Sequence, residues 1–189
     1  MPRAGLLPAT VTEVAANLAD EINPMQLSMS LVAERLGVKP PSLYKHVDGL
    51  ADLTHRIATL GAIELGDAIR DATQGRSGVD ALGAVAQVVR VYAKEHPARY
   101  AATQSASPSG PDDPLTTALD RTLKSFAAVL HDYRLDAEQE VHAIRMIRSM
   151  LHGFAALEAS NGFQMTTDIE ASLAWMVAFI DRGLRGSEE

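Results

Sequence analysis

The sequence predicts an all-α protein, and three observations support this prediction. Alanine, which favours helices, is frequent, whereas aromatic residues make up only 5% of the chain. Apolar residues recur three and four positions apart in one segment after another, as they do on one face of an amphipathic helix. Short breaks that contain proline or glycine separate these segments. We therefore expect about nine helices in the 189 residues.

The composition limits the class of protein. With no cysteine, the chain has no disulfide, no thiolate metal site and no cysteine nucleophile, which suits a reducing cytosol. The apolar runs are short and broken by charge, and the first residues lead into no signal-like apolar core, so we expect a cytoplasmic protein with no membrane partner. The net charge of -7 argues against indiscriminate coating of nucleic acid. Any contact with DNA must therefore be confined to a small part of the chain.

The N-terminal quarter predicts three short helices. Ala9 to Ile22 forms an amphipathic first helix that Asn23-Pro24 stops. A second helix runs from Ser28 to Leu36, and Gly37 follows where a left-handed residue commonly ends a helix. The two prolines that open the third helix, Pro40 to His46, give up only amides that lack an intrahelical partner.

A long fourth helix follows. Asp48 can cap it, and the pattern continues to about Ala72 before residues 74–78 end it. We place the domain boundary at its start, with residues 1–49 as an N-terminal three-helix domain and residues 50–189 as a C-terminal helical bundle. Because the two parts share a continuous helix, we expect them to be coupled rigidly.

The C-terminal bundle should contain five more helices. The first of them runs from Val79 to Glu95, and the second begins after a break at His96-Pro97 and ends at Ser105. A surface loop at residues 107–114 follows. The last three helices are expected at Leu115 to Tyr133, Asp136 to Asn161 and Thr167 to Leu184.

The stretch from Ser30 to Val47 predicts two helices joined by a tight turn. Ala33 permits close approach of the helices, Gly37 permits the turn, and the apolar Val38, Leu43 and Val47 can pack at the crossing. The window from Arg35 to His46 contains three cations and no acid. An exposed helix of this length fits the major groove of DNA. An ordinary helical hairpin inside a bundle has the same spacing, so spacing does not decide between the two.

Residues 9–57 resemble the DNA-binding domain of the tetracycline-repressor family. The resemblance rests on Val32-Ala33-x-x-Leu36-Gly37-Val38, on Leu43-Tyr44-x-His46-Val47, and on Leu53 in the next helix. It implies a helix-turn-helix domain in an all-α dimer that represses transcription until a small molecule binds its C-terminal domain.

The resemblance also implies roles for single residues. Tyr44 and His46 are expected to contact phosphates, and the residues nearest to bases or backbone are Lys39, Pro41, Ser42 and Lys45. Family members often have a lysine at the start of helix four, where this chain has Leu50. Backbone amides at that start can still receive a phosphate, but we expect a weaker salt dependence than usual. Arg3 is the only cation of the N-terminal arm, which argues against minor-groove readout.

The C-terminal half bears a second, shorter resemblance. The segment from His152 to Ala159, followed by Asn161-Gly162-Phe163, resembles the C-terminal domain of one tetracycline-repressor-like subgroup with an H-G-F-x-x-L-E pattern. This implies that the last two long helices form the dimer. The expected interface residues, some of which are simply core, are Ile144, Ile147, Leu151, Ala155, Leu173, Met176, Val177 and Ile180.

An effector pocket is expected among the central helices. Flexible and aromatic side chains with few polar anchors would suit an apolar or aromatic molecule. The candidate residues, for each of which core packing is the simpler explanation, are Tyr92, His96, Tyr100, Met146, Met150, Phe154 and Trp175.

Other activities find little support. No two of the six histidines have the spacing of two metal ligands on one helix, and no serine elbow, phosphate-binding glycine loop or close carboxylate pair is present, so we expect no metal, no cofactor and no catalysis. The predicted function is a dimeric DNA-binding regulator, a repressor that an effector releases from a palindromic operator. The alternative is a helical dimeric interaction or ligand-binding module without sequence-specific DNA binding.

Overall fold

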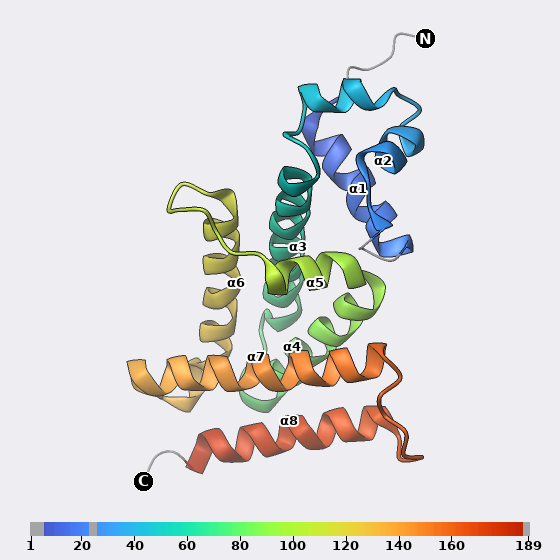
Figure 1. The fold of residues 1–189 in the computed structure, drawn as a ribbon. Coiled ribbons are helices and arrows are strands. Elements are labelled where there is room, and N and C mark those ends of the chain that lie inside the picture. The colour runs from blue at the N-terminus through green and yellow to red at the C-terminus, as the bar shows by residue number, and fades with distance from the viewer. Residues whose placement is uncertain (1–5, 23–25, 187–189) are drawn as a thin grey trace. The chain divides into compact units, whose positions relative to one another are not determined.

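The computed structural model describes residues 6–22 and 26–186, and every regular element in these ranges is a helix. The all-α prediction is therefore confirmed. The α-helices are α1 (Pro8–Glu21), α2 (Met29–Arg35), α3 (Leu50–Thr73), α4 (Gly78–Glu95), α5 (Pro97–Ser105), α6 (Pro114–Leu130), α7 (Ala137–Ala159) and α8 (Ile169–Arg185), and the 3-10 helices are η2 (Pro40–Lys45) and η3 (His131–Tyr133) (Figure 1). The predicted stop at Asn23-Pro24 and the arm residue Arg3 lie outside the described residues.

The chain divides into two compact units. The first unit consists of Met1–Ala62 and Glu95–Thr117, and the second consists of Ile63–Lys94 and Ala118–Glu189. Helix α5 thus belongs to the first unit although it follows α4 in the sequence. Helix α3 is unbroken and contributes its first half to one unit and its second half to the other.

The core of the first unit joins the three N-terminal helices to α3 and α5. Val11 and Ala15 of α1, Val32 of α2 and Leu53 of α3 are completely buried together, and Ala98 of α5 belongs to the same cluster. These apolar faces explain why such short helices are stable, because isolated helices of this length are marginal in water. Burial of Ala33 confirms the predicted close approach of α2.

The turn after α2 has the predicted geometry. Gly37 adopts φ +66°, and the amides of Gly37 and Val38 donate to the carbonyls of Glu34 and Ala33 at 3.0 Å each. Other residues rarely adopt this left-handed conformation, so glycine ends α2 without strain.

The third helix differs from the prediction. It is a 3-10 helix that ends at Lys45, one residue earlier than expected, with Ser42 N–H donating to the Lys39 carbonyl (2.9 Å) and His46 N–H donating to that of Leu43 (2.8 Å). Helices of only a few residues commonly have the 3-10 geometry, in which each N–H donates to the carbonyl three residues earlier.

The predicted cap of α3 by the Asp48 side chain is also wrong. Gly49, at φ +91°, precedes the helix, and its carbonyl accepts the amide of Leu53 at 3.1 Å. The carboxylate of Asp52 instead accepts the backbone N–H of Asp48 at 2.9 Å. An acid in the first turn of a helix can accept an amide from the chain before the helix, as in a capping box.

A carboxylate fixes α5 against α1. Asp20 accepts the backbone amides of Ala98 (2.9 Å) and Arg99 (3.2 Å) at the start of α5, and it forms an ion pair with the Arg99 guanidinium at 3.1 Å. Both side chains of the ion pair are almost fully buried. Since Asp20 satisfies amides that no intrahelical carbonyl can reach, it acts as a cap supplied by another helix.

The loop before α6 is held by one buried acid. Asp113 accepts the backbone amide (2.8 Å) and hydroxyl (2.9 Å) of Ser109, the amide of Leu115 (2.9 Å) and Nε2–H of His55 on α3 (3.0 Å). The amide of Ser109, followed by His55, lowers the pKa of Asp113 well below the usual range of an aspartate.

This lowered pKa predicts a pH dependence of stability. A carboxyl whose pKa is lower in the folded chain stabilises it above the unfolded pKa of about 4, and this contribution is lost as the pH falls below that value. We expect the midpoint of urea unfolding to fall more steeply below about pH 4 in the wild type than in Asp113→Asn. The exposed neighbour Asp112 provides the control, because Asp112→Asn should retain the wild-type slope. Equal slopes for the wild type and Asp113→Asn would contradict this assignment.

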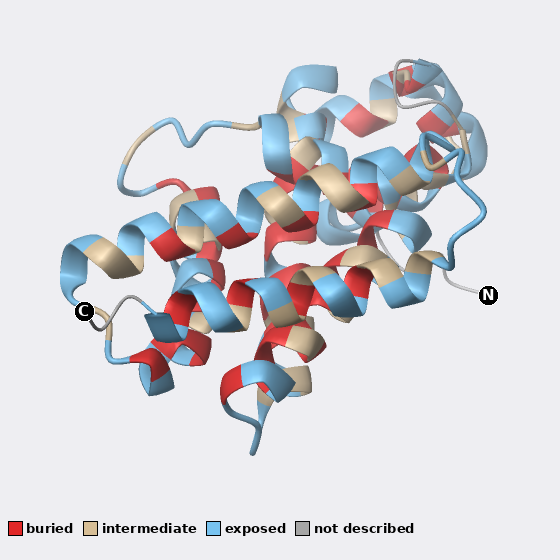
Figure 2. Ribbon diagram, turned by 90° about the horizontal axis from the view of Figure 1, so that it is seen from below, coloured by how far each residue is buried: buried red, intermediate tan, exposed pale blue. Residues whose placement is uncertain are grey.

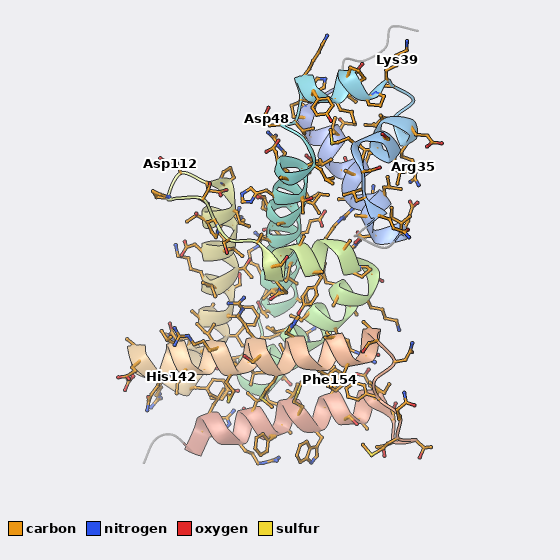
Figure 3. All side chains as sticks on the ribbon, in the orientation of Figure 1. Arg35, Lys39, Asp48, Asp112, His142 and Phe154 are labelled. Carbon is orange, nitrogen blue, oxygen red and sulfur yellow. The ribbon has the colours of Figure 1, made fainter. Side chains whose placement is uncertain are left out.

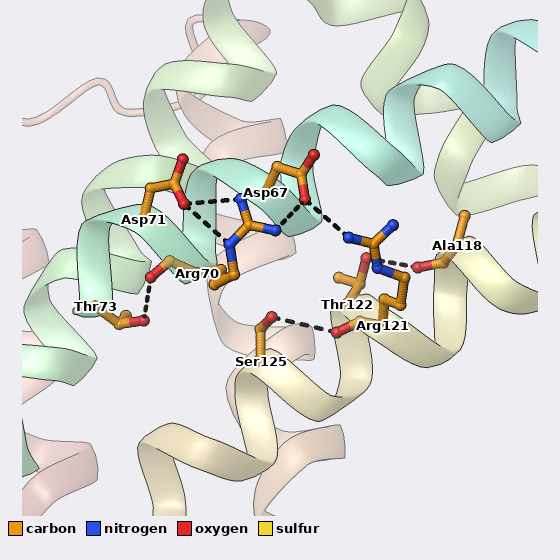
Figure 4. A network of polar contacts seen from close by, with 8 residues as sticks. All are labelled: Asp67, Arg70, Asp71, Thr73, Ala118, Arg121, Thr122 and Ser125. Atoms are coloured by element: carbon orange, nitrogen blue, oxygen red, sulfur yellow. Dashed lines mark hydrogen bonds and ion pairs between the residues drawn. The ribbon is translucent and has the colours of Figure 1, made fainter.

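In the second unit, α3 packs against α6 through a close contact and a polar network. A Cβ on Gly66 would lie 2.7 Å from Oγ1 of Thr122, so only glycine allows this approach. Asp67 of α3 accepts from Arg70 (2.6 Å) on its own helix and from Arg121 (3.4 Å) on α6, as Figure 4 shows. These exposed ion pairs contribute little energy, so the close approach at Gly66 is the more important contact between the two helices.

Helices α7 and α8 run side by side, and ion pairs between side chains connect both of them to α4. Arg90 of α4 donates to both carboxylate oxygens of Glu158 on α7 (2.6 and 2.8 Å) and also to Glu170 on α8. Arg90 and Glu158 are mostly buried, and Arg90 lowers the pKa of Glu158. This gives Glu158, the last residue of the H-G-F-x-x-L-E segment, a structural role.

Candidate nucleic-acid interface

Helix η2 is anchored by one apolar side chain and presents the others. Leu43 is completely buried, and Val47 just beyond the helix is 2% exposed. The adjacent Tyr44 is 57% exposed, and Lys45 is exposed as well. An anchored helix with an exposed aromatic and an exposed cation can contact an external surface without losing its place in the fold.

The six residues predicted to bind DNA all lie on or immediately beside η2. Lys39, Pro41, Tyr44 and Lys45 are exposed, and Ser42 and His46 are half-buried. None of them is part of the buried core. Figure 3 shows Lys39 and Asp48 at the two ends of this segment.

Carboxylates neutralise the arginines near η2. Arg35 donates to both oxygens of Glu21 at 3.0 and 2.7 Å and lowers the pKa of Glu21. Arg56 donates from Nε to Asp52 at 2.9 Å. Lys39 and Lys45 form no ion pair with any residue in the described ranges, so they are the cations of this surface that can meet a phosphate. The sequence analysis counted Arg35 together with these two lysines as a cation without a neighbouring acid.

The start of α3 is less receptive to anions than the sequence implied. The bonds from Asp48 and Arg56 lower the pKa of Asp52 although its partial burial raises it, so Asp52 is a carboxylate in the first turn. A negative charge there already compensates the helix dipole. Leu50 is exposed at the position where the resemblance expects a lysine.

The predicted effector residues are distributed over both units. His96 and Tyr100 belong to the first unit, and the other five belong to the second. Tyr92 is buried and donates from its hydroxyl to Glu64 at 2.7 Å, Phe154 contacts Phe163 with ring centroids 4.9 Å apart, and Trp175 is 66% exposed. Met146 is exposed and Met150 is half-buried. The pocket stays a prediction.

Most of the predicted dimer residues form the core of the chain's own second unit. Ile144 and Met176 are half-buried, and the six buried ones are Ile147, Leu151, Ala155, Leu173, Val177 and Ile180. Figure 2 shows buried and exposed residues recurring along the helices.

An aromatic pair on α8 is exposed, and one of its members, Phe179, is not among the residues predicted from the sequence. Trp175 stacks on Phe179 with ring centroids 5.7 Å apart, and Phe179 is 51% exposed. Their spacing of four residues places both on one side of the helix, away from the buried stripe. That spacing was the signal that could have identified them.

The fold and this surface define a helix-turn-helix DNA-binding protein: α2 and η2, joined by a left-handed glycine, rest on α1 and α3 and expose Tyr44 and Lys45. No helix in the described residues is long and apolar enough to cross a membrane.

Comparison with known proteins gives the family. Residues 82–180 match the family described as tetracyclin repressor-like, C-terminal domain. The chain is 35% identical over 176 residues to the uncharacterized HTH-type transcriptional regulator Rv0681 of Mycobacterium tuberculosis, covering 93% of this chain and 80% of that protein. It is 30% identical over 184 residues to the uncharacterized HTH-type transcriptional regulator YobS of Bacillus subtilis, covering 97% and 95%. The chain therefore belongs to the tetracycline-repressor-like family of helix-turn-helix transcriptional regulators.

Solved structures share the fold. A Rhodococcus sp. RHA1 protein of unknown function has a TM-score of 0.81 at 17% identity, covering 97% of this chain and 98% of its own. A TetR variant from Acinetobacter baumannii AYE in complex with minocycline has a TM-score of 0.73 at 20% identity, covering 98% and 99%.

Proposed function

We propose that this DNA-binding regulator is a dimeric repressor that a small apolar or aromatic effector releases from a palindromic operator. Residues 1–49 form its DNA-binding domain, and residues 50–189 provide dimerisation and effector binding. The observation that supports DNA contact best is the exposure of Tyr44 and Lys45 on a helix whose Leu43 is buried. Such a regulator needs no catalysis and acts in the cytoplasm, where it meets DNA.

In this proposal η2 of each subunit enters the major groove. Two copies related by twofold symmetry would lie about 34 Å apart, one turn of the duplex. Tyr44 and His46 contact phosphates, while Lys39, Pro41, Ser42 and Lys45 lie nearest to bases or backbone. Repression follows because the bound dimer occludes the promoter.

The dimer is proposed to form through α7 and α8. The exposed Trp175 and Phe179, together with the half-buried Ile144 and Met176, provide the contact, and the six buried residues of the predicted set support this face from within. A twofold interface uses the same patch on both subunits, so an exposed aromatic pair on one helix suits it. Membership in the H-G-F-x-x-L-E subgroup is part of the same proposal.

Release would follow from a conformational preference. An effector that binds better to a conformation with a different distance between the two η2 helices lowers DNA affinity. The unbroken α3 connects the two units and can transmit this change.

Replacing Tyr44 tests the DNA contact. In fluorescence anisotropy with DNA from upstream of the protein's own gene, we expect Tyr44→Ala to weaken binding about tenfold or more, because a charge-assisted phosphate contact and ring packing are both lost. Tyr44→Phe retains the ring and separates the two contributions. Wild-type affinity in Tyr44→Ala would favour the alternative, an interaction module without DNA binding.

The salt dependence of operator binding tests the two lysines. Each phosphate contact contributes about 0.9 to the slope of log K against log salt concentration, so Lys39→Gln or Lys45→Gln should lower the slope of a dimer by about 1.8. Arg35→Gln is the matched control, because Glu21 already neutralises Arg35. An equal loss of slope in all three variants would show that Arg35 leaves Glu21 for DNA.

A further inference from the structure

One arginine of α4 connects the end of α7 to the start of α8. The guanidinium of Arg90 donates from Nε and Nη2 to the two oxygens of Glu158, in the last turn of α7, and from Nη1 to Glu170, in the first turn of α8. Gln87, three residues earlier on α4, also donates to Glu170. Arg90 therefore holds both helices next to the segment that joins them, residues 160–168.

Stability alone does not account for this network. The side chains of Arg90 and Glu158 are only 17% and 15% exposed. Apolar residues can often replace such an enclosed ion pair without loss of stability, because the cost of desolvating two charges offsets their attraction. What the pair adds is direction, since a guanidinium binds a carboxylate through two parallel hydrogen bonds in one plane.

The apolar contacts of α7 define its rotation only weakly. A helix that faces a core usually buries a stripe about 100° wide or more. The buried residues of α7 instead lie in a single row with about one residue per turn, and two of the four are alanines: Ala143, Ile147, Leu151 and Ala155. The two parallel bonds from Arg90 to Glu158 supply a constraint on rotation that this narrow row lacks.

We propose that Arg90 is a positioning residue for the dimer, which sets the side of α7 and of α8 that each subunit presents to a second copy of the chain. This inference rests on the proposed dimer through α7 and α8. Trp175 follows Glu170 by five residues on the same helix, so a rotation at the start of α8 also moves the exposed indole ring. Arg90 itself lies on α4 and acts through Glu158 and Glu170.

Replacing the ion pair by apolar residues separates positioning from stability. Arg90→Met/Glu158→Leu leaves neither charge enclosed without its partner, so we expect no loss of stability in urea unfolding. Unfolding is compared in a background that carries Trp175→Glu and Phe179→Glu, which removes the contribution of dimerisation to stability. Without these two substitutions, the same variant should dissociate at least about tenfold more readily than the wild type in sedimentation equilibrium, because the directional bonds are lost.

The fluorescence of Trp175 reports on the position of α8, because this is the only tryptophan of the chain. Its side is 66% exposed in the single chain, and a partner subunit should cover it and limit quenching by acrylamide. At a concentration at which Arg90→Met/Glu158→Leu still sediments as a dimer, we expect its emission to be quenched more strongly than that of the wild type. Equal quenching would mean that α8 presents the same side without Arg90.

Arg99 provides the matched control. It forms an ion pair with Asp20 that is also almost fully buried but lies in the first unit. Arg90→Gln and Arg99→Gln each leave an enclosed carboxylate without its cation and should lower stability, but only Arg90→Gln should weaken the dimer. Equal losses of dimer affinity in these two variants, or wild-type affinity in Arg90→Met/Glu158→Leu, would overturn the role of Arg90 and leave the proposed dimer intact. A monomeric wild type would overturn both.

Discussion

Replacing both Trp175 and Phe179 by glutamate will separate the subunits and weaken operator binding at least about a hundredfold, because a monomer engages one half-site where the dimer engages two. The two rings are stacked and more than half exposed in the single chain, so four carboxylates would meet across a twofold interface. Analytical ultracentrifugation gives the mass, and anisotropy gives the affinity.

A matched substitution separates this effect from a general effect of surface charge. Leu123 of α6 lies in the same unit and is 38% exposed, so Leu123→Glu should leave the mass and the operator affinity unchanged. If the Trp175/Phe179 double variant sedimented as a dimer, the proposed face on α8 would be wrong.

Leu43→Ala will have the second largest effect. A six-residue 3-10 helix has little stability of its own, and Leu43 is its completely buried side chain. The truncation should lower the free energy of unfolding by about 3 kcal/mol and abolish operator binding at temperatures where the circular dichroism of the other helices persists. Chemical denaturation measures the first effect and anisotropy the second.

Leu31→Ala is the control for this truncation. Leu31 lies on α2 in the same motif but is 37% exposed, so its loss leaves no cavity and should change stability much less. Operator binding retained at full strength in Leu43→Ala would mean that η2 is not the element that meets DNA.

Several elements could be predicted because their causes are local. Pro8 and the spacing of Val11, Ala15 and Leu18 define α1, and Gly37 defines the end of α2. Asp136 caps α7 with Gln139 completing a capping box, which again requires only neighbouring residues. The identity and spacing of neighbouring residues are enough to predict where such helices begin and end.

Other features depended on partners far away in the sequence. Sequence counted Arg35 as a free cation, but Glu21, fourteen residues earlier, binds it. The periodic pattern placed Leu173 and Val177 on an apolar face of α8. It did not show whether that face packs against the chain's own core or against a partner subunit, and in the structure both residues are buried within the chain.

The sequence by itself determined the helical class, the helix boundaries to within a few residues, and the turn that makes α2 and η2 a motif, because propensity, capping and glycine geometry act over a few neighbouring residues. The tertiary structure alone decided that α5 belongs to the unit of the DNA-binding helices, through the contact of Asp20 with Ala98. Packing brings together residues with no regular spacing in the chain, and a periodic pattern cannot record such contacts.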